Sequence, residues 1–332
     1  MADEEPGNTG AKRSKGFMSK YSLADFANER KPELYTLASS IVLLVTTAAV
    51  RTFLFCLGDC KIKEDENYDN FLKKVTDREK GTPLLTVSNH RSLFDDPAIM
   101  SGILPLQLAV QPRYNRNAIC SQEYCCVSKL PTPMHVYTGL GRVLPIKRGA
   151  GINQKLLLDF ARLVAAGEWC HVFPEGGIWQ WDTLGGRRNG HEKELGKLKW
   201  GIGKLIAHAP VTPEVVPFYF KGTETIYPQD ENKVVKNKLP IPGHKVNIRF
   251  GEEIRFDDLI AEHEKVYGAL WKYKASLKQE STYGTEKESE FHEYWDSRPE
   301  DLLLYAKITS RIEEALTKLN DAHLLEHGPS KP

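Results

Sequence analysis

The stretch Leu84–Met100 reads LLTVSNHRSLFDDPAIM, and it decides the fold class of the chain. Its first five residues form a short apolar run of the kind that makes a buried strand, and the residues from Pro97 onward fit a helix. Asp96 suits the N-cap of that helix, and Pro97 suits its first position because proline lacks an N–H group that would have no partner there. A strand that leads directly into a helix is typical of α/β domains.

The same alternation continues along the chain. Apolar runs typical of strands lie at 84–88, 117–121, 142–146, 169–173, 215–220 and 245–250. Helical patterns fit 97–104, 153–166, 196–209, 257–277 and 301–320. We therefore expect a single α/β domain over residues 61–277, with a central mixed sheet flanked by helices, and a C-terminal helical extension over 278–332.

The N-terminal part divides into a polar arm, residues 1–30, which we expect to be disordered, and a membrane-associated helix over 31–60. The helix contains the longest apolar run of the chain, Leu34–Leu57, which is long enough to span a bilayer. Arg51 lies inside the run, and an arginine at mid-span costs about 2.5–3.5 kcal/mol. Three interpretations remain open: a transmembrane helix, a helix lying in the membrane interface, and a buried core helix. Membrane contact is favoured, through the side chains of Leu34, Ile41, Leu44, Val45, Phe53 and Phe55.

Composition excludes several classes of protein. Of 332 residues, 41% are hydrophobic and 27% are charged, which is typical of a globular protein and not of a disordered one. Lys and Arg (45) nearly balance Asp and Glu (44), so the net charge of +1 argues against a nucleic-acid partner. The six cysteines are too few for a disulfide framework, and no paired Cys spacing predicts a metal site.

His90 is the first candidate catalytic residue, because it lies in the turn between the strand and the helix, where α/β proteins concentrate functional groups. Asp95 follows five residues later, an offset of about 140° on a regular helix, so a bond between the two requires a turn that folds back. If the bond forms, the carboxylate orients the imidazole, and His90 can act as a general base for a hydroxyl. The alternative is a polar turn histidine beside a capping aspartate.

Two further groups follow apolar strands. Lys147 and Arg148 offer positive charge to a phosphate, or else form a solvated strand end. Glu175 either positions a hydroxyl, pairs with Arg148, or belongs to an ordinary Pro-Glu-Gly turn. His171 lies inside an apolar strand and is expected to be a core histidine.

In this order, the motifs Asn89-His90-x4-Asp95, Arg148, Phe173-Pro174-Glu175-Gly176 and Val216-Pro217 resemble the blocks of the glycerolipid acyltransferase family. The resemblance covers about 82–220 and implies an acyltransferase domain. It also implies that His90 and Asp95 activate the acceptor hydroxyl. Asn89, Lys147, Arg148 and the residues Phe173, Pro174, Glu175 and Gly176 would then hold the glycerol-phosphate part of the lipid.

Gly177-Ile178 follows the Phe-Pro-Glu-Gly block, where the members of this family that use acyl-CoA have Thr-Arg. The stretches LKWGIGKLIA (198–207) and VPFYFKGTETIYP (216–228) resemble the mitochondrial phospholipid transacylases of the family, although the long segment 179–197 is a departure. This resemblance implies transfer without a cofactor or metal, from phosphatidylcholine to monolysocardiolipin, to give cardiolipin. It also implies a mitochondrial membrane location facing the intermembrane space.

Two alternatives remain open: an acyl-CoA-dependent lysophospholipid acyltransferase, and an inactive scaffold that binds lipid. The oligomeric state is not predicted.

Overall fold

The structure, a computed structural model, describes residues 32–122, 137, 139–148, 155–180, 187–188, 191–192, 198–230, 234–237, 239–273 and 297–328. The predicted arm at 1–30 lies outside the described residues, as do most of segment 179–197, the first part of the C-terminal extension and the side chain of Leu34.

Within the described residues, seven strands form one sheet in the order β1-β9-β8-β2-β5-β3-β4. The strands are β1 (Asp59–Ile62), β2 (Leu84–Ser88), β3 (Asn117–Ser121), β4 (Val143–Ile146), β5 (Trp169–Val172), β8 (Glu214–Lys221) and β9 (Lys245–Phe250). Neighbouring strands are parallel except β8 and β9, so the predicted mixed sheet is confirmed. The sequence did not predict β1, an edge strand whose alternate residues are exposed and polar. A separate two-stranded pair consists of β6 (Arg187–Arg188) and β7 (His191–Glu192).

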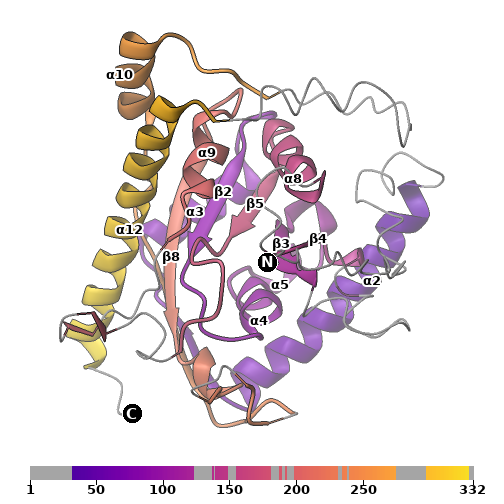
Figure 1. Cartoon of the computed structure of the whole chain (residues 1–332). Helices are drawn as coiled ribbons and strands as arrows, with labels where there is room; N and C mark the ends of the chain where they lie inside the picture. Colours follow the sequence, from indigo (N-terminus) through magenta and orange to yellow (C-terminus); the bar gives the residue numbers. More distant parts are fainter. Residues whose placement is uncertain are drawn as a thin grey trace, which may run out of the picture.

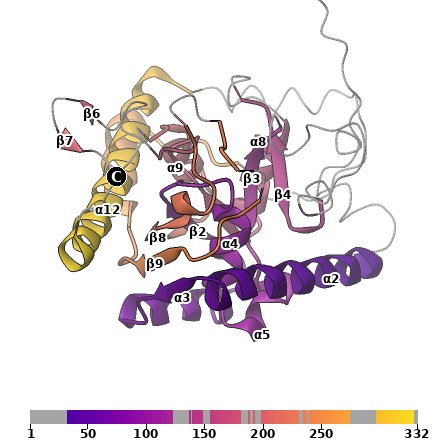
Figure 2. The same cartoon turned by 90° about the horizontal axis from the view of Figure 1, so that it is seen from below.

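Helices cover both faces of the sheet (Figures 1 and 2). One face packs against α2 (Pro32–Arg51), its π-helical continuation Thr52–Cys56, α3 (Glu66–Thr76), α4 (Asp95–Gly102) and α5 (Leu106–Ala109). The other face packs against α8 (Lys155–Ala165), α9 (Gly201–Ala207), α10 (Asp257–Tyr267) and α12 (Pro299–His327). Two hydrophobic cores result, one on each side of the sheet, and the central strands β2, β5 and β8 between them are buried on both faces.

The limits of α4, α9, α10 and α12 all differ from the expected ones, and α4 and α10 show a physical reason. Helix α4 begins at Asp95, Phe94 occupies the N-cap position, and Asp96 does not cap the helix. Asp96 instead pairs with the buried guanidinium of Arg116, which needs a counter-charge inside the protein. Helix α10 ends at Tyr267, ten residues before the expected end at 277, because Gly268 follows with φ +82°, a conformation that ends a helix.

Helix α2 has two different sides. Ser39, Leu43, Thr47 and Val50 are buried against the domain, so the helix is not a free span. Leu37, Ile41, Leu44 and Val45 are more than half exposed on the outer side, so it is not a fully buried core helix either. The segment Leu37–Cys56 is long and apolar enough to cross a membrane, and it indicates membrane association.

Of the residues predicted to contact the membrane, Phe53 turns inward. Its ring stacks on His244, with 4.7 Å between ring centroids, and meets the edge of Phe94. Phe55 is partly exposed beneath the guanidinium of Arg51.

Candidate active site

The carboxyl end of β2 opens into a turn, residues 89–94, in the middle of the sheet. Asn89, the first residue of the turn, is buried, and its side-chain amide donates to the Phe220 carbonyl (2.7 Å) and accepts from the Phe220 N–H (3.1 Å). Predicted as a substrate contact, Asn89 here fixes the turn to the end of β8.

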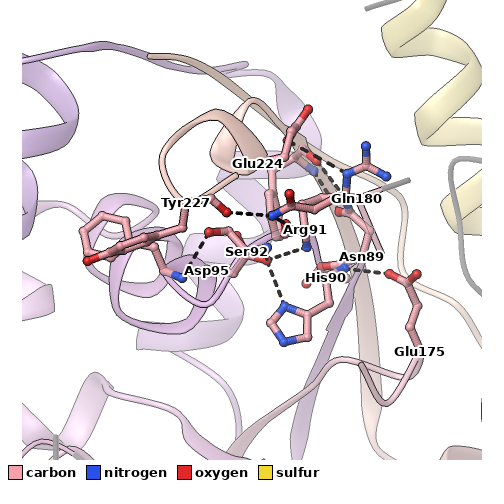
Figure 3. A network of polar contacts seen from close by, with 12 residues as sticks. Asn89, His90, Arg91, Ser92, Asp95, Glu175, Gln180, Glu224 and Tyr227 are labelled. Carbon is pink, nitrogen blue, oxygen red and sulfur yellow. Dashed lines mark hydrogen bonds and ion pairs between the residues drawn. The ribbon is translucent and has the colours of Figure 1, made fainter. Parts of the chain in front are cut away.

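His90 and Asp95 meet at the base of this turn. His90 Nδ1 lies 2.8 Å from Asp95 Oδ2, which also accepts the backbone N–H groups of Arg91 (2.6 Å) and Ser92 (2.7 Å). The turn thus folds back on the first residue of α4, which overcomes the unfavourable helical offset. A carboxylate only accepts hydrogen bonds, so in the neutral imidazole Nδ1 carries the proton and Nε2 is the proton acceptor. In Figure 3 this second nitrogen points away from the other labelled side chains.

The loop after β5 clamps His90 from the other side. Glu175 Oε1 accepts the His90 N–H at 2.6 Å, and the Trp179 N–H donates to the His90 carbonyl at 3.0 Å. The imidazole stacks on Phe173, with 4.2 Å between centroids and 16° between planes, while 18% of the His90 side chain remains exposed. Glu175 itself is 1% exposed, and its carboxylate holds the His90 main chain through this hydrogen bond. Sequence reasoning did not consider this contact.

Two cationic side chains approach the Gly176–Gly177 turn. A Cβ on Gly177 would lie 4.0 Å from Arg148 Nη2, and one on Gly176 would lie 3.2 Å from Lys199 Cγ. The Lys199 N–H also donates to the Pro174 carbonyl at 2.7 Å. Arg148, Lys147 and Lys199 are all exposed, which suits side chains that hold a phosphate group in solvent.

Gln180 is a residue of the site that sequence reasoning missed. Its Nε2 donates to the carbonyls of Arg91 (2.7 Å) and Tyr227 (2.9 Å), and its Oε1 accepts the Gln229 N–H (2.8 Å). One amide therefore ties together the His90 turn, the Glu175 loop and the loop after β8 (Figure 3). All three partners are backbone groups, so no sequence signal marked the residue.

His171 is buried beneath the site and bonds Thr86 Oγ1 at 3.0 Å. Burial, with the charges of Arg116 and His90, holds the pKa of His171 well below its usual value. His171 is therefore a neutral core histidine, as predicted. Within the described residues, no group of three or more His, Cys, Asp or Glu side chains could hold a metal ion.

Comparison with known proteins shows what this chain is similar to. Residues 64–221 match the family model described as Acyltransferase. The chain is 33% identical over 198 residues to N-acylphosphatidylethanolamine synthase of Arabidopsis thaliana, covering 60% of this chain and 65% of that protein. It is 31% identical over 199 residues to Tafazzin of Drosophila melanogaster, covering 60% of this chain and 47% of the relative.

A third relative, Tafazzin of Saccharomyces cerevisiae, is 25% identical over 277 residues, which are 74% of this chain and 69% of the yeast protein. The chain thus spans between about half and two thirds of the length of the relatives it matches. The family match includes His90, Asp95 and the Glu175 loop, so over residues 64–221 the chain is similar to the acyltransferase family.

Proposed function

We propose that this protein is a tafazzin-like transacylase, which moves an acyl chain from a phospholipid to a lysophospholipid without coenzyme A. The observation that carries the proposal is the 2.8 Å contact between His90 Nδ1 and Asp95 Oδ2, with the ring partly exposed at the carboxyl end of a central strand. The similarity to two tafazzins and the Gly177-Ile178 pair support this branch of the family. Phosphatidylcholine would be the donor, monolysocardiolipin the acceptor and cardiolipin the product.

The geometry allows a direct transfer. His90 Nε2 takes the proton of the acceptor hydroxyl, and the oxygen attacks the ester carbonyl of the donor. The tetrahedral intermediate then expels the alkoxide of the donor lysolipid, which recovers the proton from His90. Asp95 stabilises the imidazolium between these two steps. One ester replaces another, so the reaction is nearly thermoneutral and needs no nucleotide.

Lipid substrates require access from a bilayer, and the outer side of α2 supplies an apolar surface for it. Leu37, Ile41 and Val45 on α2 are exposed, as is Leu106 on the adjacent α5. We propose that this surface lies in the membrane interface, with one side of α2 in lipid and the other on the domain. A mitochondrial membrane, facing the intermembrane space, is the location that the resemblance implies.

A second candidate function follows from the relative named N-acylphosphatidylethanolamine synthase. Here the acceptor would be the amine of phosphatidylethanolamine, and the product would contain an amide in place of an ester. The same histidine would remove the proton from the attacking nitrogen.

Acyl exchange from labelled phosphatidylcholine distinguishes these functions. The acceptors are monolysocardiolipin and phosphatidylethanolamine, each tested with and without acyl-CoA. We expect transfer to monolysocardiolipin without acyl-CoA, and a loss of about 100-fold in His90→Ala. His327→Ala is the matched control, because His327 is a half-exposed histidine near the end of α12, and it should keep full activity.

The other outcomes contradict the first proposal in different ways. Label on the amine of phosphatidylethanolamine favours the second candidate. A strict requirement for acyl-CoA identifies an acyl-CoA-dependent acyltransferase. Absence of exchange, with lipid binding equal in wild type and His90→Ala, identifies an inactive scaffold.

A further inference from the structure

Arg51 lies in the apolar N-terminal segment, but its guanidinium turns toward the protein. Its Nη1 lies 3.1 Å from the carbonyl oxygen of Ser101, 3.2 Å from that of Gly102 and 2.9 Å from that of Leu104. The carbonyl between them, on Ile103, accepts the hydroxyl of Tyr68 at 2.9 Å. All four carbonyls from 101 to 104 therefore receive a side-chain donor from the N-terminal elements.

These carbonyls end helix α4. The last carbonyls of a helix have no partner within it and carry partial negative charge, so a cation placed there stabilises the helix. Hydrogen bonds from a charged guanidinium are also stronger than neutral ones. Leu54, in the continuation of α2, packs against the same end, where a Cβ on Gly102 would be 3.4 Å from Leu54 Cδ1.

The opposite end of α4 carries the acid of the catalytic pair. Asp95 is the first residue of the helix, and Gly102 is the last. A helix of eight residues is about 12 Å long and behaves as a short rigid element, so a shift at its end moves its beginning. Most of its residues are buried, which leaves the helix little room to tilt without repacking.

We infer that Arg51 is a positioning residue, which docks α2 onto the end of α4 and so holds Asp95 within hydrogen-bond distance of His90. The inference rests on the proposed function of the His90–Asp95 pair. It makes α2 a part of the catalytic domain: its outer side faces lipid, while its inner side sets the geometry of the active site.

Two variants of α2 separate these roles. Arg51→Met removes the guanidinium on the inner side and keeps a long apolar chain. The double variant Ile41→Gln with Val45→Gln changes only exposed side chains on the outer side. Arg255→Met is the matched control, because Arg255 is exposed in the loop before α10.

The full-length variants are assayed in two ways. Acyl transfer in detergent micelles gives kcat and KM, and flotation with vesicles of phosphatidylcholine and cardiolipin gives membrane binding. We expect Arg51→Met to lower kcat by about tenfold, the loss for one misplaced catalytic contact, with KM and flotation unchanged. The outer-side variant should weaken flotation more than it lowers kcat, and Arg255→Met should behave as wild type. A loss confined to flotation in Arg51→Met overturns the inference.

A coupling test shows whether Arg51 acts through Asp95. In an Asp95→Asn background, Arg51→Met should cost less than about twofold further, because the residue it positions is already disabled. Additive losses would overturn the inference. Amide hydrogen exchange over 95–103 should be faster in Arg51→Met, and Arg51→Lys should recover part of both kcat and protection.

If Arg51→Met does not fold, Arg51→Lys and Tyr68→Phe decide, since each weakens the capping of the same carbonyls. Smaller losses of kcat at constant KM support the inference, and unchanged kcat in both overturns it. One result would overturn the proposed function alone. In that case the folded wild type transfers no acyl chain, while Arg51→Met still speeds amide hydrogen exchange in α4.

Discussion

Glu175 offers the sharpest test of how the active site is assembled. Sequence reasoning expected this carboxylate to contact substrate or Arg148, and the structure adds a contact that was not expected, with Oε1 accepting the His90 N–H at 2.6 Å. The two roles predict different kinetics. A substrate contact mainly sets KM, whereas an anchor of the His90 main chain mainly sets kcat.

The magnitude follows from the hydrogen bond. A bond to a charged acceptor contributes about 1.5–3 kcal/mol, and a neutral one about 0.5–1.5 kcal/mol. Glu175→Gln keeps an acceptor of the same shape, so it should lose about 1 kcal/mol, or about fivefold in kcat. Glu175→Ala leaves the His90 N–H without its partner and should lose about 3 kcal/mol, or about 100-fold in kcat.

The assay is acyl transfer in detergent micelles with saturation curves for both lipids, beside urea unfolding of each variant. We expect kcat to fall in the order wild type, Gln, Ala, with KM within about twofold. Arg148→Gln is the contrasting variant, because the loss of a contact to the substrate phosphate should raise KM. A rise in KM at constant kcat in Glu175→Ala would refute the anchoring role and restore the substrate contact.

Three further predictions test other parts of the molecule. Asp95→Asn should lower kcat about 100-fold in the micelle assay, because an amide cannot stabilise the imidazolium as a carboxylate does, and a loss below threefold would contradict the role of Asp95. Gln180→Ala should lower the free energy of unfolding in urea by about 2–3 kcal/mol, because three backbone groups lose their partner, and an unchanged midpoint would contradict this. Burial lowers the pKa of His208 from 6.5 to about 4, so between these values the unfolded chain binds a proton that the folded chain does not. The free energy of unfolding should therefore fall as the pH drops through this range. In urea titrations, His208→Gln should remove about 2 kcal/mol of the loss that the wild type shows between pH 7 and pH 5. If the variant loses as much free energy as the wild type, His208 is not the source of the loss.

Most of the fold could be predicted from the sequence, because strands buried on both faces of a parallel sheet have short apolar sequences. Strands β3 and β9 have the predicted limits, and the strand–turn–helix unit around His90 is present. The start of α4 was misplaced by a local rule. Asp96 before Pro97 has the pattern of a cap, but its carboxylate is taken by Arg116, twenty residues later. A capping rule cannot detect a partner so distant in sequence.

The same distinction separates the predicted and the missed parts of the site. His90 and Asp95 are five residues apart, so their contact depends on one turn and can be inferred from spacing. Glu175 and Gln180 reach backbone groups more than 80 residues away. Because nearly every residue has an N–H and a carbonyl, nothing in the side-chain sequence identifies those partners.

The structure gives Arg51 a different role from the one that its sequence context suggests. Hydropathy treats it as a cost to membrane insertion, yet its guanidinium donates hydrogen bonds to three carbonyls at the end of α4. For α2 to cross a bilayer, these bonds would have to break, which would leave a guanidinium in hydrocarbon at about 2.5–3.5 kcal/mol and free the end of α4. Lying in the interface avoids both costs, because the inner side keeps its contacts while the outer side enters lipid. The charge that weakens the case for a spanning helix is thus the same charge that favours a helix fixed between the membrane and the active site.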